Sequence, residues 1–433
     1  MTAIALKLTP LDVLFFRDAR PFDQADSADS RLPTPQSFYG LVKTHLAKTF
    51  GLPLSKIHGL RKSNDPNRWI SEIRTRGAWL YVDQPEKLKA WLLNKAHDPD
   101  RLNAICQGVI VPVPADIVQL GKSGDEFARL RPVGDDVTVP GWDDDARRPL
   151  WSNDDESPRA ASGFLGQVAL QKYLRGEELC ANDIIPTSRL YDFEPRTGIG
   201  VNSTTMIASD SQIYSASFLR LQPGVSFYGE IEVDDEHDSK LRRAFAELIT
   251  LPWGGEGRRV CVETCEPIKW PEPPMPNGEQ AGQLLSLLIT PGIFGSRDGR
   301  CQNGLGENPQ ASWMPRELGT LKAAAVPRPM AISGWNLSGR TDNDAETGDA
   351  EKNADEEKVA DWTPSLQGCP RPTRYAAPAG SVYFWQRGKN NRSDKNGTDL
   401  KPLESLGGKP LESDAGWGLS LTGVWKCFKE KPD

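Results

Sequence analysis

The sequence is poor in several residue types, and each shortage excludes a class of protein. Its 433 residues include only 7 cysteines and 4 histidines. The cysteines are odd in number and spread over more than 300 residues, unlike the paired framework of a small secreted domain. We therefore expect reduced thiols and no disulfide scaffold.

Long apolar segments are also missing. No segment approaches the roughly 18 to 20 consecutive apolar residues that a membrane-spanning helix needs. The first thirty residues contain Asp12, Arg17, Asp18 and Arg20, where a signal peptide requires an apolar core. We expect a soluble, cytoplasmic protein that does not contact a membrane.

Patterns that would hold a metal or a cofactor are weak. Cys261 and Cys265 share one face of an expected strand, but no CxxC or HxxxH pattern lies nearby to complete a zinc site. Two ordinary half-buried thiols are the favoured interpretation. Gly416, Gly418 and Gly423 superficially resemble a dinucleotide loop, yet their GxGxxxxG spacing leads into a strand and not into a helix. We expect no metal and no cofactor.

Acidic residues are concentrated in two segments. Residues 341–361 contain nine acids against two lysines, and residues 134–157 contain eight acids against two arginines. Because the whole chain has a net charge of −7, the remainder carries six more basic than acidic residues. A polyanionic partner is therefore not excluded, since it would bind a local basic patch. Residues 341–361 and 388–415 hold so few large apolar side chains that we expect disordered loops there.

The rest of the chain predicts an α+β fold. Alternating apolar residues indicate a strand at 4–8, and Thr34 and Pro35 indicate the start of a helix. Two further alternations, 213–221 and 225–233, are separated by Gln222-Pro223-Gly224 and predict a hairpin. The other expected elements are a helix with Leu241, Phe245, Leu248 and Ile249 on one side, and strands at 258–265, 283–290, 380–386 and 417–425.

The order strand, strand, helix, strand over 213–265 is the second half of a ferredoxin-like βαββαβ unit. If the N-terminal strand and helix belong to a similar unit, the chain holds two such units with large insertions. The strands at 380–386 and 417–425 would then close a sheet.

Residues 14–22 read LFFRDARPF and place two arginines, Arg17 and Arg20, among aromatic rings. Guanidinium groups grip phosphates in a bidentate manner and rings stack on bases, so the segment suits a polyanion such as RNA. A salt-bridged turn through Asp18, with the phenylalanines in the core, explains the same residues equally well.

Two further loops combine glycine with arginine. Residues 194–200 (EPRTGIG) place Arg196 beside a glycine turn, although a plain turn is the more common outcome. Residues 254–259 (GGEGRR) place glycines directly before Arg258 and Arg259. Together with the first loop, they favour a shared polyanion-binding surface.

Taken in order, these segments resemble a known family. They read LDVLFFRDARPF, LPTPQSFYGLVK, PRTGIGVN, GGEGRR, LLITPGIF, AISGWN, PAGSVYFW and GWGLSLTGVW. The same order is typical of the third Cmr subunit of type III-B CRISPR effector complexes, a member of the RAMP superfamily. The resemblance covers residues 4 to 426, although Ala19 stands where family members commonly have glycine.

The resemblance implies a non-catalytic RNA-binding subunit with two ferredoxin-like (RRM-like) domains, which we place at 1–200 and 201–433. Such a subunit binds the repeat-derived 5′ tag of the crRNA and joins the large signature subunit to the first backbone RAMP subunit. The residues implied to face RNA are Arg17, Arg20, Arg196, Arg258 and Arg259, together with Gly416, Gly418 and Gly423 of a glycine-rich loop.

Two alternatives remain open. A RAMP-fold endoribonuclease would use a histidine as general base, but His45 lies in the apolar stripe of the expected first helix, where a satisfied core histidine is more common. His58, His97 and His237 lie in polar loops with no acid or tyrosine partner in view. A purely protein-bridging scaffold would have no RNA contact at all.

Overall fold

A computed structural model describes the chain from residue 2 to residue 428, with gaps. The described ranges are 2–17, 27–57, 60–93, 102, 105–121, 126–142, 147–152, 157–201, 205, 207–274, 282–294, 318–336, 369–370, 373–387, 402–406 and 413–428. The expected loop 341–361 lies outside these ranges, and only 402–406 and 413–415 of the expected loop 388–415 are described. None of the helices within the described ranges is long and apolar enough to cross a membrane.

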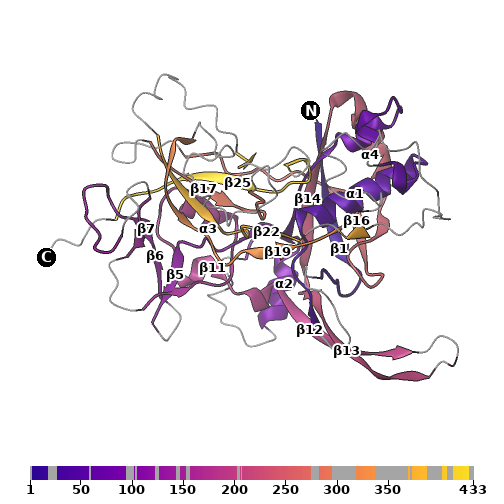
Figure 1. The fold of residues 1–433 in the computed structure, drawn as a ribbon, viewed down its shortest axis with the longest axis horizontal. Helices are drawn as coiled ribbons and strands as arrows, with labels where there is room; N and C mark the ends of the chain where they lie inside the picture. The colour runs from indigo at the N-terminus through magenta and orange to yellow at the C-terminus, as the bar shows by residue number, and fades with distance from the viewer. Residues whose placement is uncertain are drawn as a thin grey trace, which may run out of the picture.

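The fold is α+β, as predicted, and strands dominate it (Figure 1). The α-helices of the described ranges are α1 (Pro35–Thr49), α2 (Pro85–Leu93), α3 (Gln167–Leu174) and α4 (Asp238–Ala244). The first sheet has the strand order β11 (Ile184–Ile185), β10 (Phe164–Leu165), β4 (Gly108–Pro112), β3 (Arg74–Val82), β14 (Val225–Val233), β1 (Thr2–Pro10), β16 (Arg259–Cys265) and β15 (Ile249–Pro252).

Two more sheets position the site. The C-terminal sheet has the order β18 (Thr320–Ala325), β23 (Val382–Gln386), β17 (Gln283–Leu288), β25 (Leu419–Val424) and β24 (Glu404–Ser405). The hairpin sheet has the order β12 (Tyr191–Val201), β13 (Ala208–Leu221) and β2 (Ser27–Asp29). Small sheets join β5 (Ile117–Leu120), β6 (Glu126–Arg129) and β9 (Arg159–Ala160); β7 (Arg131–Pro132) and β8 (Leu150–Trp151); β19 (Met330–Ile332) and β22 (Arg374–Ala376); and β20 (Trp335–Asn336) and β21 (Cys369–Pro370).

The first sheet takes strands from both sides of residue 200. β1 lies between β14 and β16 and is antiparallel to both, and β14 pairs with β3 on its other edge. Helix α1 connects β1 towards β3, and α4 lies between β14 and β16 in the chain. Residues 225–265 therefore complete the sheet that β1 begins.

The C-terminal sheet repeats this strand order. β17 lies between β23 and β25 and is antiparallel to both, and β18 pairs with β23. If the four strands of each sheet are numbered in chain order (β1, β3, β14, β16 and β17, β18, β23, β25), both sheets have the spatial order 2-3-1-4. The two halves of the molecule thus share one topology, although their connections differ greatly in length.

One face of β1 is buried and only Ala5 is buried on the other, which explains its apolar alternation. Ile4, Leu6 and Leu8 join one core together with Phe38 and Leu46 of α1. On the opposite face Ala5 belongs to a second core that includes residues of the C-terminal sheet and of α3. The two sheets therefore pack against each other through this second core. Each fully buried aliphatic side chain of this kind contributes about 1.5–3 kcal/mol.

Helix α1 begins where the sequence predicts. Thr34 is extended, with φ −83° and ψ 157°, and Pro35 is the first helical residue. A proline is well tolerated at this position because its missing N–H would have no partner within the helix. The helix buries Phe38, Leu41, Val42 and Leu46 against β1 and β3, which confirms the predicted stripe.

Helix α4 is shorter than predicted. It spans Asp238–Ala244, and Leu241 and Phe245 are buried as expected. Leu248, however, is 65% exposed, and Ile249 opens strand β15. The predicted helix through Ile249 is wrong, because the chain turns back after two helical turns so that β15 can pair with β16.

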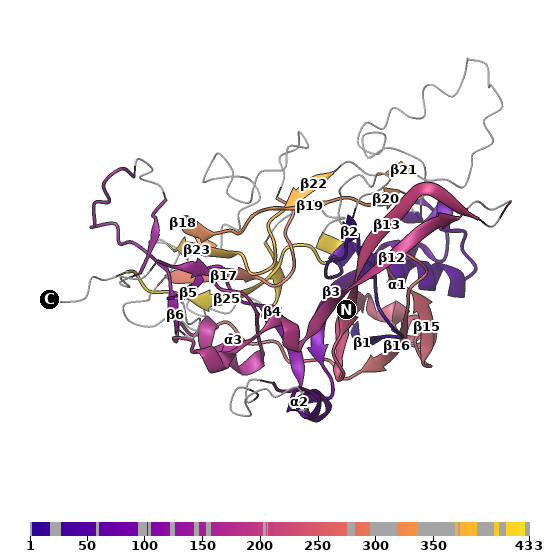
Figure 2. The ribbon, with the colours of Figure 1, turned by 90° about the horizontal axis from the view of Figure 1, so that it is seen from below.

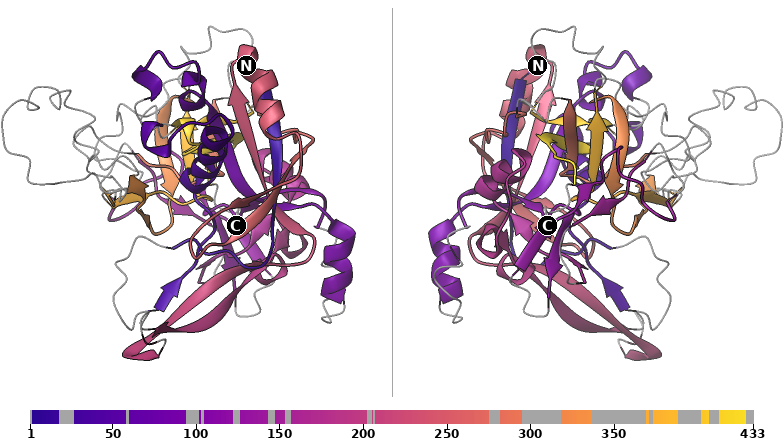
Figure 3. Two further views of the ribbon diagram at one scale, coloured as in Figure 1. Left: turned by 90° about the vertical axis from the view of Figure 1, so that its right-hand side faces the viewer. Right: turned by 90° about the vertical axis from the view of Figure 1, so that its left-hand side faces the viewer.

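The hairpin predicted around Gln222-Pro223-Gly224 is also wrong, although both of its strands exist. β13 pairs along its length with β12, whereas β14 pairs with β1 and β3. The turn instead carries the chain from the hairpin sheet into the first sheet, where Gln222 N donates to Leu190 O and Gly224 O accepts from Asp83 N. The true hairpin, β12–β13, extends away from the body of the molecule in Figures 1 and 3, and Figure 2 views the molecule from the side on which it protrudes.

Candidate nucleic-acid interface

Two of the predicted arginines meet at the base of the β12–β13 hairpin. Arg196 on β12 pairs with Glu194 at 2.7 Å and with Asp12 at 3.1 Å. Arg220 on β13 pairs with the same two carboxylates, and Arg258 lies 3.8 Å from Asp12. We call these five residues the hairpin-base cluster. Three arginines against two acids leave it with one positive charge in excess.

The hairpin-base cluster keeps its carboxylates charged. Burial raises the pKa of Asp12, but hydrogen bonds from Arg196 and Arg220 outweigh this effect and hold it below its ordinary value. Hydrogen bonds from Arg220 and Arg196 likewise lower the pKa of Glu194. The guanidinium groups therefore bind the hairpin to the segment after β1, and this is the contact that the structure gives them.

Aromatic packing reinforces the same contact. The guanidinium carbons of Arg196 and Arg258 lie 5.3 and 4.6 Å from the ring centre of Phe218 on β13. The Phe218 ring in turn lies 5.1 Å from that of Phe15. Cation–π contacts of this kind contribute about 0.5–1 kcal/mol each at exposed sites.

The segment with Arg17 runs beside the hairpin, but its rings are not on the surface. Phe15 and Phe16 are 7% and 8% exposed, and Phe16 packs edge-on against Trp253. The interpretation that these phenylalanines are core residues is confirmed, and their stacking on bases is excluded by burial. Arg17 forms a β-bridge with Ser30. Asp18 and Arg20 lie outside the described residues.

The glycines before Arg258 and Arg259 allow a tight turn against this segment. A Cβ atom on Gly254, whose φ is +83°, would come within 2.5 Å of Phe15 O, and Gly255 N donates to that same oxygen. Arg259 points to the other edge, where its Nη2 donates to Thr250 O at 3.1 Å. Three sequence motifs are therefore contiguous in space, with Arg17, Arg196 and Arg258 brought together by backbone pairing.

The glycine-rich segment with Gly416, Gly418 and Gly423 forms a turn followed by a strand. Gly416 and Gly418 have φ of +84° and +70°, and a Cβ on Gly416 would lie 2.6 Å from Thr75 O of β3. Thr290 Oγ1 donates to Gly416 O at 2.8 Å. Gly423 lies instead within β25, where a Cβ would meet Leu174 O of α3 at 2.8 Å. Only the first two glycines form a loop, and Gly423 permits close packing of a helix on a sheet.

Basic side chains surround this turn. Asp414 pairs with Arg61 at 3.4 Å and with Arg74 at 3.5 Å. Burial lowers the pKa of Lys43, on α1, to about 8, and the charge of Asp414 opposes this shift. Burial raises the pKa of Asp414 against the influence of Arg61 and Arg74. One acid and three bases leave this part of the surface positive.

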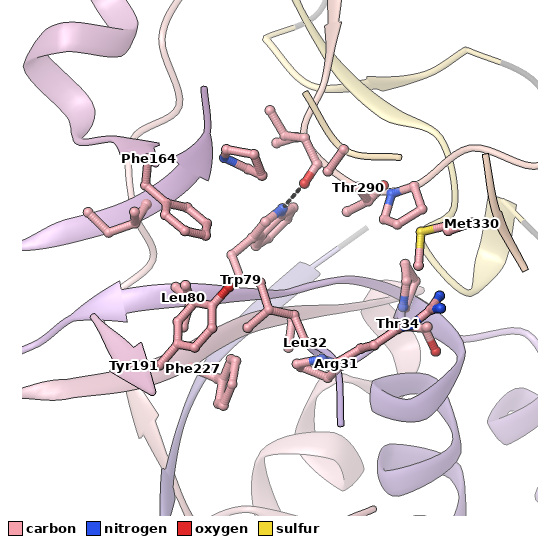
Figure 4. Close-up of a pocket in the computed structure, with 18 of the residues that line it drawn as sticks. Arg31, Leu32, Thr34, Trp79, Leu80, Phe164, Tyr191, Phe227, Thr290 and Met330 are labelled. Carbon is pink, nitrogen blue, oxygen red and sulfur yellow. Dashed lines mark hydrogen bonds between the residues drawn. The ribbon is translucent and has the colours of Figure 1, made fainter. Parts of the chain in front are cut away.

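A cavity of about 470 Å³ connects the motifs (Figure 4). Arg31 lines the cavity, as do Tyr191 and Phe193 at the start of β12. Arg31 directly follows Ser30, which forms the β-bridge with Arg17. Thr290 and Pro291, which hydrogen-bond to the glycine turn, form another wall. Three of the motifs therefore lie next to residues that line the cavity, whereas residues 254–259 contact Phe15 and Phe218 instead.

The structure also places two of the four histidines. His45 Nε2 is 2.7 Å from Ala244 O, and its ring packs on Phe245, which confirms a satisfied core histidine. His237 stacks on Trp69 and lies 3.0 Å from Glu236. His58 and His97 are outside the described ranges. No described group of three His, Cys, Asp or Glu side chains could hold a metal ion.

The two cysteines considered for zinc are free and half-buried, as predicted. Burial raises the pKa of Cys265 to about 11, so its thiol stays protonated at neutral pH. Its side chain packs against the second core.

Sequence reasoning missed several residues of this interface. Asp12 and Arg220 complete the hairpin-base cluster but belong to no glycine–arginine motif. Lys43, inside the apolar stripe of α1, carries a weak signal as a charge on a buried face. Arg31 stands between two recognised motifs and could have been included with them.

Comparisons with known proteins identify relatives of the chain. No curated protein matches it. Among solved structures, a chain of the type III-B Cmr-beta complex bound to cognate target RNA and AMPPnP is 13% identical, with a TM-score of 0.44, 88% of this chain covered and 86% of that chain. A chain of the Csm1–Csm4 cassette in complex with AMPPNP is 13% identical, with a TM-score of 0.27 and coverages of 67% and 77%. At these TM-scores the likeness does not define a function.

The match to a protein-family model is far more extensive. The model of the CRISPR-associated protein family Cas_Cmr3 matches residues 6–425, which is nearly the whole chain. This range includes every motif on which the resemblance was based, from the segment of Arg17 to the strand of Gly423. The chain therefore belongs to the CRISPR-associated Cas_Cmr3 family.

Proposed function

We propose that the chain is a non-catalytic RNA-binding subunit of a type III-B Cmr effector complex. In this role it binds the 5′ repeat-derived tag of the crRNA and joins the large signature subunit to the first backbone RAMP subunit. Membership of the Cas_Cmr3 family supports the proposal that the chain is part of such a complex. The observation that carries RNA binding is that the segment of Arg17, the β12–β13 hairpin and the glycine turn at Gly416 adjoin one cavity, while Arg258 joins the hairpin-base cluster beside them.

The proposed architecture is two ferredoxin-like units. Strands β1, β3, β14 and β16 with α1 and α4 follow the βαββαβ order, and their sheet has the first strand between the third and fourth. Strands β17, β18, β23 and β25 have the same arrangement. These pairings favour a division between β16 and β17, rather than at residue 200, as the boundary between the units.

The charge distribution suits a single-stranded polyanion. The hairpin-base cluster and the turn at Asp414 each carry more arginine and lysine than acid. Positive grooves that follow a nucleic-acid backbone, combined with aromatic side chains, are the usual means of binding single strands. Arg17 and Arg20 complete the proposed RNA contacts, with Arg196 and Arg258 holding the hairpin that borders the path. Arg259, which donates to Thr250 O at the β15 edge, would contact RNA only outside this path.

The test compares two crRNAs, one with the intact tag and one with the tag scrambled, at two salt concentrations. Binding is measured for the full chain alone and with its neighbouring subunits, and the RNA is recovered to detect cleavage. Preference for the intact tag without cleavage is the expected result. Cleavage would support the endoribonuclease alternative, and indifference to the tag in the assembled complex would support a protein-bridging scaffold.

A further inference from the structure

The cavity lies between the two halves of the molecule and is partly open to solvent. This cavity of about 470 Å³ lies within the roughly 300–1,000 Å³ range of small-molecule sites. A partly open, largely apolar space of this size is suited to receive part of a ligand.

The walls of the cavity favour a flat aromatic group. Its lining is largely apolar and includes Trp79 of β3 and Phe164 of β10, both labelled in Figure 4. Tyr191 and Phe193 alternate along β12 and so lie on the same face of that strand. Phe193 is 46% exposed, which is unusual for a phenylalanine and leaves its ring accessible.

Two polar features make the cavity different from a simple apolar groove. Burial raises the pKa of Tyr191 to about 12, so its phenol is protonated at neutral pH and can donate a hydrogen bond. The Trp79 indole N–H, in contrast, is already used by Ile289 O at 2.9 Å, the dashed contact in Figure 4. Arg31 adds a positive charge along one side, extending towards Met330.

We propose that this cavity receives one unstacked nucleobase of the bound RNA, with Tyr191 and Phe193 as aromatic walls and Arg31 beside its phosphate. The inference rests on the proposed function and specifies how it is performed. A base supplies a flat ring for the aromatic walls, an acceptor for the phenol and a neighbouring phosphate for the guanidinium. An aliphatic side chain or a lipid tail offers neither the flat ring nor the acceptor for the phenol.

The location explains how one base could be held by both halves of the molecule. The cavity is lined by β3 and β14 of the first sheet and by the segment after β17. Thr290 in that segment hydrogen-bonds to Gly416 O and accepts from Leu419 N, so the glycine turn fixes one wall of the cavity. The glycine turn is therefore a positioning element for the site.

The experiment uses single-stranded RNAs in which one abasic nucleotide is moved along the tag. Binding is measured with the full chain, alone and with its neighbouring subunits. For one position of the tag, loss of the base should weaken binding by about 5- to 150-fold, since stacking of one base contributes about 1–3 kcal/mol. Other positions should show smaller effects.

Three variants connect that position to the cavity. Ala379→Phe fills the cavity from its lining and Phe193→Ala removes an accessible wall; each should weaken binding of intact RNA and abolish the extra loss from the abasic position. Tyr191→Phe removes only the phenol and should reduce discrimination among bases at that position. Ala160→Phe, on the exposed strand β9, adds the same bulk elsewhere and should bind like the wild type.

The outcomes separate the two claims. If no tag position stands out, or if Ala379→Phe and Phe193→Ala bind and discriminate like the wild type while tag preference persists, the base site is wrong and the proposed function stands. If Ala379→Phe releases a neighbouring subunit without changing RNA affinity, a protein side chain occupies the cavity and the base site is again wrong. Absence of any tag preference would overturn the proposed function together with this inference.

Discussion

Arg196, on the protruding β12–β13 hairpin, lies 3.1 Å from Asp12, which follows the central strand of the first sheet. The two residues are 184 positions apart in sequence, so this pair fixes the direction in which the hairpin leaves the body. The same Asp12 accepts a hydrogen bond from Arg220 on the second strand of the hairpin. Arg196, which the sequence suggests as an RNA contact, therefore holds the hairpin in its orientation relative to the body.

The hairpin-base cluster should make the stability of the fold depend on pH in the acidic range. The pKa values of Asp12 and Glu194 are lower in the folded chain than their ordinary values. Their contribution is therefore complete above pH of about 4 and is lost as the pH falls below it, because the folded state must then take up protons against the arginines. We expect the Tm difference between the wild type and Asp12→Asn to be constant from pH 8 to 5 and to shrink below pH 4.

Because salt screens exposed ion pairs, the Tm difference between the wild type and Asp12→Asn should also decrease as salt is added. A matched control is Glu86→Gln, which removes an exposed acid that pairs with Lys89 at 3.8 Å. A difference that grows below pH 4 would contradict the assignment of these pKa directions.

The buried Glu230 should show the opposite dependence on pH. Burial raises its pKa, although Tyr228 and Trp270 donate hydrogen bonds to its Oε1 at 2.8 and 3.0 Å. A carboxyl whose pKa is higher in the folded state lowers stability as the pH rises from its ordinary value through the raised one. Glu230→Gln keeps an acceptor for both hydrogen bonds, so it should raise the Tm relative to the wild type more at pH 7 than at pH 4.

The test of Glu230 is a series of thermal melts of both proteins between pH 4 and pH 8. Tyr228→Phe, which removes one of the two donors, serves as the control and should lower the Tm at both pH values. A Gln variant that is less stable than the wild type at pH 7 by the same amount as at pH 4 would show that the charge of Glu230 is not disfavoured.

The glycine turn should not tolerate a side chain at Gly416. Its φ of +84° is unfavourable for other residues, and a Cβ would approach Thr75 O to 2.6 Å. We expect Gly416→Ala to reduce the free energy of unfolding by about 1–3 kcal/mol, the usual cost of a strained backbone position. Gly257→Ala has a similar φ of +64° with no atom within 4 Å, so it should cost less.

A glycine in a helix serves as a further control, because its replacement by alanine changes helix propensity without straining the backbone. Gly40 lies within α1 with no atom within 4 Å of its Cβ position. Gly40→Ala should therefore stabilise the chain by about 0.5–1 kcal/mol. Urea unfolding of the three variants measures the order directly, and equal losses at positions 416 and 257 would contradict the close contact with Thr75.

RNA binding should distinguish the arginines by salt dependence. Removing a phosphate contact to a single strand lowers the slope of log K against log salt by about 0.7. We expect Arg17→Gln to show this change. Arg196→Gln should change the slope less, because its guanidinium already pairs with Asp12 and Glu194, and should instead lower the Tm. Equal slope changes in the two variants would show that Arg196 contacts phosphate directly.

Local features of the fold could be predicted because neighbouring residues determine them. The extended Thr34, the proline that begins α1 and the buried face of that helix follow from side chains within a few positions of each other. The alternation at β1 and the free, half-buried cysteines at 261 and 265 were recognisable for the same reason.

Pairing over long distances could not be predicted. The turn at Gly224 looks like a hairpin, but the partner of β13 is β12 and not β14, and no local pattern records which strand will be adjacent. The same limit applies to the interface: Arg196 and Arg258 are visible as motifs, whereas the carboxylate of Asp12 that occupies them becomes visible only when three distant segments fold together. The burial of Phe15 and Phe16 likewise depends on Trp253 and the glycine turn that covers them.

Photo-crosslinking of a crRNA tag that carries 4-thiouridine, followed by mapping of the crosslinked peptides in the assembled complex, tests the central claim most directly. The account predicts crosslinks in the segments around Arg17 and Arg31, at the start of β12 near Tyr191 and Phe193, and in the glycine turn at 413–418. A tag that crosslinks to this chain only at the opposite edge, around β5 and β6, or not at all, would contradict it.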